Sequence, residues 1–238
     1  MDNAVYATLG RQTGLMAQMR MVANNIANAN TTGYRGESVG FVEYIRTTGS
    51  GASLSMATAR VKLTDWTQGS LSPTGGDLDL AIEGEGFFLV QTPQGPRLTR
   101  SGHFTANENG DLVTSEGHAV LDAGGAPVFV PQGQGPVGIA PDGTISAGGE
   151  PVGQVGIVLP REPDGLVREG GTLFRADEGT DPALNGRVLQ GFLEESNVNP
   201  VLEVSRMIEV QRAYEMGQGF LDREDERIRK TIQALQTR

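Results

Sequence analysis

The pattern of apolar residues near the N-terminus predicts an amphipathic helix over residues 1–30. Steps of three, four or seven positions place these residues on one helix face. They are Val5, Leu9, Met16, Met19, Val22 and Ile26. We expect the helix to end near Asn30, because Thr31 and Thr32 are β-branched and Gly33 suits a left-handed cap.

The intrinsic stability of this first helix is low. Gly10 and Gly14 lie inside it, and each costs about 1 kcal/mol relative to alanine. An isolated helix of this quality is marginal in water. Our hypothesis is that the segment is disordered in the free monomer and folds when it meets its neighbours.

A second apolar stripe predicts a helix over residues 200–238. Pro200 suits the first helical position and Asn199 suits the cap. The helix would be about 58 Å long, which is more than a small domain can cover. Its stripe therefore needs another helix, for which the N-terminal segment is the obvious partner, although a peripheral helix on its own domain stays possible. The stripe consists of Val204, Met207, Val210, Tyr214, Leu221, Ile228, Ile232 and Leu235.

Between these ends, the pattern changes to that of short strands and turns. All 12 prolines lie between Pro73 and Pro200, and 25 of the 34 glycines lie between Gly69 and Gly191, so the middle is rich in turn formers. The dipeptides at 109–110 and 142–143 predict type I′ hairpin turns. The expected product is a β-rich domain of the sandwich or barrel type.

One strand of this middle region has a marked alternation. Leu78, Leu80 and Ile82 alternate with acidic residues, which predicts one dry face and one wet face. The linker before it, residues 36–70, is rich in Gly, Ser and Thr, with short extended pieces at 39–45 and 59–66. Trp66 ends that linker and is expected to be a core anchor.

The predicted organisation is a mainly β central domain flanked by N- and C-terminal α-helices that pair as a coiled-coil-like bundle. Residues 1–35 and 200–238 form a discontinuous helical domain, residues 36–70 an extended linker, and residues 71–199 the central β-rich domain. A length of 238 residues is enough for one good core with a smaller second module.

Composition excludes several classes of function. A net charge of −10 argues against nucleic acid as a partner, and the absence of cysteine removes disulfides and thiolate zinc sites. No apolar run is long enough to span a membrane, so no membrane insertion is expected. The N-terminus shows no cleavable secretory signal, and composition alone would place the chain in the cytoplasm.

The side chains that could carry chemistry do not assemble into an active site. His103 and His118 are the only histidines, and each stands beside a glycine in a predicted hairpin. Residues 107–111 have oxygen ligands for calcium but lack the distal glutamate that a calcium loop needs. Asp77 and Asp79 share one strand face, yet nothing separates their pKa values for acid–base work. We expect no enzyme, no cofactor and no metal.

Four stretches resemble the bacterial flagellar rod and hook proteins. The first reads Asn24-Asn25-Ile26-Ala27-Asn28-Ala29-Asn30-Thr31-Thr32-Gly33-Tyr34-Arg35, and its order of Asn, Thr and Gly is a specific signal. The others cover residues 68–88, 100–121 and 190–215, in the family's order. Residues 122–187 carry no signature. Within the family, the length and the opening residues 1–6 are most like the proximal rod proteins, with distal rod and hook subunits as near alternatives.

The resemblance implies a structural subunit of the flagellar basal-body rod that assembles through its terminal helices into a tubular axial structure. It also implies that the partners are copies of the chain, other rod subunits and the flagellar export apparatus. The place would be the rod in the periplasmic space, reached without a cleaved signal. The alternative from another class is a surface- or carbohydrate-binding β domain with helical oligomerisation ends, which would use the wet face of the strand at residues 77–83.

On this interpretation, two sets of residues form the assembly interface. Apolar residues of both helices would form a seam: Leu9, Met16, Met19, Ile26, Ile208, Tyr214, Leu221 and Ile228. Polar residues of the first signature would form a joint between subunits: Asn24, Asn25, Asn28, Thr32 and Gly33.

Overall fold

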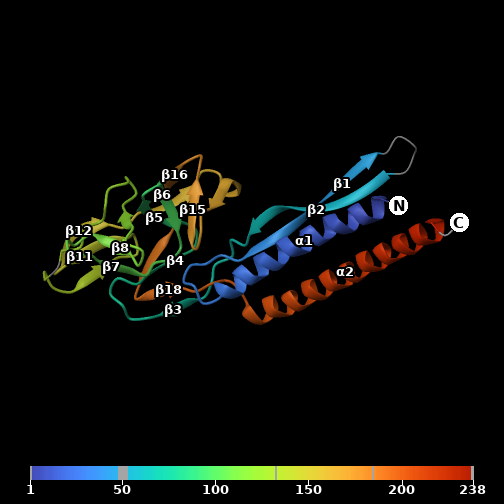
Figure 1. Ribbon diagram of the computed structural model, residues 1–238. Helices are drawn as coiled ribbons and strands as arrows, with labels where there is room; N and C mark the ends of the chain where they lie inside the picture. Colours follow the sequence, from blue (N-terminus) through green and yellow to red (C-terminus); the bar gives the residue numbers. More distant parts are fainter. Residues whose placement is uncertain (1, 48–52, 132, 184, 237–238) are drawn as a thin grey trace. The chain divides into compact units, whose positions relative to one another are not determined.

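The computed structural model describes residues 2–47, 53–131, 133–183 and 185–236, which form two compact units (Figure 1). The helical unit comprises Met1–Ala27, Gly36–Asp65 and Val198–Arg238, and the β unit comprises Asn28–Arg35 and Trp66–Asn197. The predicted fold class is confirmed. The two terminal helices contact each other, and antiparallel sheets lie between them in the sequence.

The helical unit consists of two helices and one β-hairpin. Helix α1 (Asp2–Ala27) contacts both α2 (Pro200–Gln236) and the hairpin of β1 (Glu37–Thr47) and β2 (Ser53–Thr64). Figure 1 shows α1 between the hairpin and α2, with the two helices antiparallel. The segment expected as an extended linker is therefore largely a hairpin, and residues 48–52 of it lie outside the described residues.

Local hydrogen bonds explain where α2 begins and where α1 ends. The Asn199 side chain accepts hydrogen bonds from the amides of Val201 and Leu202, at 3.1 and 3.2 Å, so the predicted cap of α2 is confirmed. Helix α1 ends at Ala27 rather than near Asn30. The cause is Asn28, whose carbonyl and side-chain oxygens both accept hydrogen bonds from Thr31 in a turn.

The β unit is built on a nine-stranded antiparallel sheet with smaller pairs beside it. The main order is β14-β15-β6-β5-β9-β8-β7, with β13 paired to β5 and β16, and the other strands form β10-β11-β12, β4 with β17, and β3 with β18. The strands are β3 Leu71–Pro73, β4 Leu80–Glu83, β5 Phe87–Thr92, β6 Gly95–Thr99, β7 Phe104–Ala106, β8 Leu112–Thr114, β9 Ala119–Leu121, β10 Val137–Ile139, β11 Thr144–Ala147, β12 Glu150–Gln154, β13 Ile157–Pro160, β14 Leu166–Arg168, β15 Leu173–Ala176, β16 Thr180–Pro182, β17 Arg187–Gln190 and β18 Phe192–Glu194, with a 3₁₀ turn at Pro163–Gly165.

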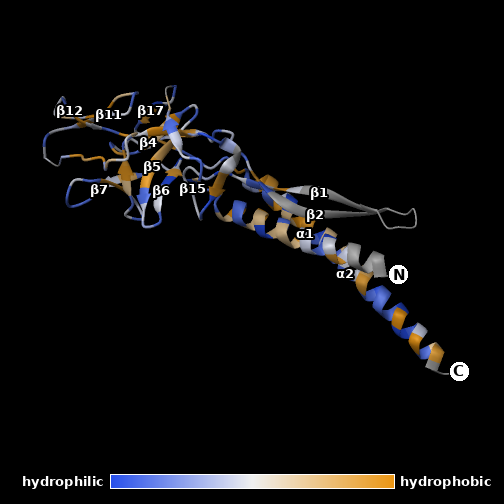
Figure 2. Cartoon of the chain, turned by 90° about the horizontal axis from the view of Figure 1, so that it is seen from above, coloured by the Kyte–Doolittle hydropathy of each residue, from blue (hydrophilic) through white to orange (hydrophobic). Residues whose placement is uncertain are grey.

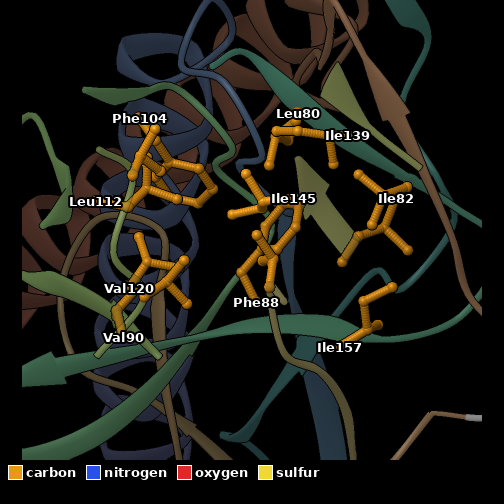
Figure 3. Close-up of a cluster of buried hydrophobic side chains, with 14 residues drawn as sticks. Leu80, Ile82, Phe88, Val90, Phe104, Leu112, Val120, Ile139, Ile145 and Ile157 are labelled. Atoms are coloured by element: carbon orange, nitrogen blue, oxygen red, sulfur yellow. The ribbon is translucent and has the colours of Figure 1, made fainter. Parts of the chain in front are cut away.

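Figure 3 shows the larger apolar cluster of this unit. Phe88 of β5 packs edge-on against Phe104 of β7, with ring centres 5.2 Å apart, and Leu80 and Ile82 of β4 join them. Ala81, between these two, is also fully buried, whereas Glu83, on the same face as Ala81, is exposed. The predicted alternation therefore holds for Leu80, Ile82 and Glu83 and fails at Ala81, where other parts of the unit cover the second face.

The predicted type I′ turns are also wrong. In the described residues only glycines have a positive φ, so Asn109 and Asp142 do not take the conformation that such a turn demands. The Asn107 side chain instead accepts hydrogen bonds from the amides of Asn109 and Asp111, and the Asp142 carboxylate accepts one from the amide of Thr144. That hydrogen bond lowers the pKa of Asp142.

Candidate assembly site

The signature loop, Asn28–Arg35, is fastened to the β unit through its backbone. The Gly33 amide donates a 2.7 Å hydrogen bond to the Glu194 carbonyl, and the Asn197 amide donates to the Tyr34 carbonyl. Gly33 has a φ of +70°, and a Cβ there would lie 2.3 Å from the Ser101 nitrogen. Only glycine fits this position, so the glycine that the sequence assigned to a helix cap is a packing residue of the loop.

A buried ion triad joins the loop to two other parts of the β unit. The Glu194 carboxylate lies 2.5 Å from Arg35 Nη1 and 3.1 Å from Arg100 Nη1. Glu194 is 0% exposed, Arg35 1% and Arg100 5%. Such charges are costly to bury, and they are tolerated only when hydrogen bonds satisfy most of their remaining atoms.

Backbone groups provide those hydrogen bonds. The Gly69 amide donates to Glu194 Oε1 at 3.0 Å, and Arg35 donates to the Thr67 carbonyl at 2.7 Å. Arg100 donates to the carbonyl of Ile82, which lies in β4, and to that of Gly84, which follows β4. Burial lowers the pKa of the Arg100 guanidinium, while the Glu194 charge opposes that change. The triad therefore links five separate segments of the chain.

Stacked rings and guanidinium groups continue from the loop into the sheet. The Arg168 guanidinium lies between the rings of Tyr34 and Phe174, 4.7 and 4.6 Å from their centres. Trp66 packs on Phe174 at 5.1 Å and on Phe87 at 5.9 Å. Trp66 thus anchors a ring cluster as expected, but it stays 38% exposed.

The residues of the predicted polar joint are divided between the two units. Asn24 (exposed) and Asn25 (buried) lie on α1, whereas Asn28, Thr32 and Gly33 belong to the signature loop. Thr32 lines a polar hollow of about 270 Å³ together with Asn30, Ser72, Thr74 and Glu195. The arrangement leaves amide, hydroxyl and carboxylate groups at one place on the β unit.

Within the helical unit, the contact between α1 and α2 is partly polar. The Asn25 amide nitrogen donates to the Glu37 carbonyl at 2.8 Å and to Glu203 Oε2 at 3.1 Å, while its oxygen accepts from the Glu37 amide. Toward the other end of α1, Gln12 Nε2 donates to the Tyr214 carbonyl. Leu15, Met21, Val22 and Val210 supply the buried apolar part. The polar pairs fix the register of the two helices.

The residues predicted for the apolar seam are more exposed to solvent than the residues of this contact. Leu9, Ile208 and Ile228 are 55%, 45% and 43% exposed. Met16, Met19, Ile26, Tyr214 and Leu221 are half-buried. Gln12 and Glu203 could not be predicted, because polar residues inside an apolar stripe give no periodic signal. Glu37 could not be predicted either, because it lies in the hairpin, remote from both helices in the sequence pattern.

Neither a metal centre nor a membrane span is evident in the described part of the chain. No group of three or more His, Asp or Glu side chains there is placed to hold a metal ion. None of its helices combines the length and the apolar character that crossing a membrane requires.

Comparison with protein families gives three matches along the chain. The description "Flagella basal body rod protein" matches residues 6–35, "Flagellar hook protein FlgE/F/G D1 domain" residues 81–147, and "Flagellar basal body rod FlgEFG protein C-terminal" residues 189–234. The first match includes the signature loop and the third includes Glu194, the centre of the ion triad.

Relatives that match nearly the whole chain belong to the same family. The flagellar basal-body rod protein FlgF of Caulobacter vibrioides is 40% identical over 245 residues, covering 99% of this chain and 98% of the relative. FlgF of Mesorhizobium japonicum is 40% identical over 90% of both chains. The rod protein FlgG of Bacillus subtilis is 31% identical over 98% of both.

These matches, with paired terminal helices around a β-rich middle, define an axial structural protein and not an enzyme. The chain belongs to the flagellar basal-body rod protein family, is most like the proximal rod protein, and is a structural subunit of the rod.

Replacing Glu194 by Gln is expected to destabilise the β unit by about 3–5 kcal/mol, because two guanidinium groups would stay buried without their counter-charge. Denaturant unfolding of the full chain measures this change. Glu195→Gln is the matched control, since that carboxylate is exposed and accepts a hydrogen bond from the Ser70 hydroxyl, and its loss should change stability by less than about 1 kcal/mol. Equal effects of the two variants would show that the triad contributes nothing special.

Replacing Asn25 by Ala should weaken the helical unit by about 1–3 kcal/mol, because buried groups of Glu37 and Glu203 would lose a partner. Loss of helical circular dichroism on heating is the measurement, made at a chain concentration at which the helical unit is formed. Asn24→Ala, at the exposed neighbouring position, should have a smaller effect. A greater loss for the Asn24 variant would contradict the assignment.

Proposed function

We propose that the chain builds the proximal part of the rod by polymerising through its two terminal helices. The observation that carries the proposal is that α2 leaves many large apolar side chains exposed. They are Val201, Leu202, Val204, Ile208, Met216, Ile228, Ile232 and Leu235. Exposed apolar surface on this scale is typical of a site that other protein covers.

The difference in helix length supports the same conclusion. The contacts of Gln12 with Tyr214 and of Asn25 with Glu203 set an antiparallel register. Followed to the start of α1, this register leaves about ten residues of α2 without a neighbour on α1, a length of roughly 15 Å. Figure 2 shows this C-terminal end of α2 extending past α1, with apolar and polar bands along it.

The C-terminal end of α2 carries its own solvated face. Arg227 pairs with Glu224, Arg229 with Asp225 and Lys230 with Glu226, each one turn apart. Ile228, Ile232 and Leu235 are the apolar residues among them. Burial of such side chains against neighbouring helices stabilises a polymer by about 25 cal/mol for each Å² of apolar surface removed from water.

The remaining parts of the proposal concern partners and place. The neighbours are copies of this chain and other rod subunits, and the exposed and half-buried residues of the seam and of the polar joint form the contacts between them. Asn25 and Gly33 are buried within their own units and act by holding those units in shape. The chain is delivered by the flagellar export apparatus without a cleaved signal and is assembled in the periplasmic space. Family membership and the exposed helix surface support these statements.

Replacing Ile228 by Asp should abolish motility without unfolding the β unit, because a carboxylate cannot be buried in a helix seam without a partner. Swimming of a strain carrying the variant and the melting temperature of its β unit are the two measurements. Ile228→Leu keeps the apolar surface and should leave swimming intact. Normal swimming of the Asp variant, or a lower melting temperature of its β unit, would count against the proposal.

Hydrogen exchange of the dilute purified chain tests whether assembly is coupled to folding. We expect residues 1–27 and 200–238 to exchange quickly, because the weak first helix gains most of its support from neighbours. Residues 28–35 and 71–192 should be protected, because the signature loop is hydrogen-bonded into the β unit. Protection of both terminal segments at low concentration would show that the helix pair folds alone, and coupled folding would then be wrong.

A further inference from the structure

A groove lies between the two helices of the helical unit. Its volume is about 370 Å³, and its apolar walls include Leu15 of α1 and Met216 and Phe220 of α2. Met216 is 67% exposed, so the chain itself leaves this part of the groove open. Figure 1 shows the two helices side by side. An apolar side chain of another molecule would fit this surface.

The contact between the helices is incomplete inside the groove. Gln12, which lines the groove, is buried, and its Nε2 donates a 2.9 Å hydrogen bond to the Tyr214 carbonyl. A Cβ at Gly217 would lie 2.3 Å from this nitrogen, so the glycine is what admits the amide. Gln12 Oε1 is buried without a hydrogen-bond partner among the described residues. Because buried polar groups are nearly always paired, a single copy does not complete the packing at this place.

The groove carries positive charge. Arg11 and Arg223 line it, and both residues are exposed. No acidic residue belongs to the lining, and neither guanidinium pairs with a carboxylate of the described chain, since Arg223 donates only to the Gly219 carbonyl of its own helix. Exposed charges of one sign favour a partner of the opposite sign. The groove therefore suits an apolar side chain that has a carboxylate beside it.

The first half of α2 presents that combination on another face. Val204 and Ile208, one turn apart, are 47% and 45% exposed. Glu209 follows Ile208, is exposed, and pairs with no cation of the described chain. At 3.6 residues per turn, Ile208 lies at least about 120° around the helix from the groove residues Gly217 and Phe220. The apolar and acidic face is thus a different surface from the groove.

Most other acids of the two helices are already engaged. Helix α1 has a single acid, Asp2, at its first residue. On α2, Glu203 is buried and Glu215 accepts a hydrogen bond from Gln211. Three further acids of α2 pair with cations of their own chain, namely Glu224, Asp225 and Glu226.

Asp222 is the remaining exposed acid of α2, and it provides a matched comparison. It too pairs with no cation of the described chain, but its neighbours one turn away are polar or glycine, and the adjacent Leu221 is half-buried. Glu209, in contrast, stands next to the exposed Ile208. Glu209 is therefore the acid of these helices that best complements the groove.

We infer that the groove of one copy receives the Ile208 side chain of a second copy, with Glu209 of that copy beside Arg11 and Arg223. A copy cannot fill its own groove in this way, because Ile208 and the groove residues of α2 lie on different faces of one continuous helix. Two different surfaces of the molecule then meet, so the contact continues from copy to copy instead of closing as a two-fold dimer. The inference rests on the proposed function and names the surfaces through which the helices polymerise.

Cysteine crosslinking tests the contact, because the chain has no cysteine of its own. Full-length chains with Ile208→Cys are mixed with full-length chains with Met216→Cys, at the highest concentration at which both stay soluble, and treated with a short bismaleimide. We expect a link between position 208 of one copy and position 216 of the other, as read by mass spectrometry of the crosslinked peptides. Arg229→Cys in place of Met216→Cys is the control, since Arg229 is exposed on the same helix outside the groove. No link to position 216, or no preference for it over position 229, would overturn the inference.

Charge exchange between the two mixed chains tests the role of Glu209. Adding Glu209→Arg to the Ile208→Cys chain, or Arg223→Glu to the Met216→Cys chain, should lower the yield of the link about two- to five-fold. Both reversals together should restore the yield, because the charges are complementary again. A purely structural effect of either variant would not be restored.

Asp222→Arg in the Ile208→Cys chain is the matched control, and it should leave the yield unchanged because Asp222 lies away from the exposed apolar face. A yield that stays low when both reversals are combined, or that falls equally with Asp222→Arg, would overturn the inference. Circular dichroism of each variant checks that its helices are intact.

The outcome separates this inference from the proposed function. The link is measured in solution and does not require a rod, whereas the Ile228→Asp test reads motility. Loss of motility in that variant together with no link between positions 208 and 216 would retain helical assembly and reject the groove contact. A link at these positions with normal motility of the Ile228 variant would do the reverse.

Discussion

The β unit depends on one carboxylate that two guanidinium groups share in the absence of water. Glu194 ends the last strand of the unit, Arg35 ends the signature loop, and Arg100 follows β6. Because an unpaired buried charge is so unfavourable, the three segments must come together for any one of them to be buried. The stacked Tyr34, Arg168 and Phe174 extend this dependence to the far edge of the sheet. Conformational specificity, rather than net stabilisation, is the better account of such a triad.

Periodicity predicted the helices because a stripe of apolar residues is visible without any tertiary information. The cap at Asn199 was equally local and could be predicted for that reason. The end of α1 could not be predicted from apolar spacing, because it depends on a turn at Asn28. There the Asn28 carbonyl accepts a hydrogen bond from the Thr31 amide, and the Asn28 side chain accepts one from the Thr31 hydroxyl. The alternation around Leu80 predicted a strand and its dry face but not the burial of Ala81, since coverage of that position is decided by segments remote in the sequence.

The polar part of the candidate site was beyond sequence reasoning for a similar reason. Arg35 and Glu194 both lie in stretches that carry the family resemblance, yet nothing in either stretch indicates that the two side chains meet. Their atoms are 2.5 Å apart, but 159 positions of sequence separate the two residues. Asn25 was selected from the signature by its residue type, and its partners Glu37 and Glu203 come from a hairpin and from the other helix. Exposed apolar residues of α2 were recognised as a stripe, whereas their division between intramolecular and open surfaces required the structure.

The way in which the chain enters and leaves the β unit has an evolutionary consequence. The entering loop and the departing strand are hydrogen-bonded to each other, from Gly33 to Glu194 and from Asn197 to Tyr34, so the unit is tied at its base. A segment whose two ends meet is an insertion that can be lengthened, shortened or exchanged while the flanking helices keep their sequence. Proteins with the same terminal helices can therefore diversify their β-rich middle by recombination at this base.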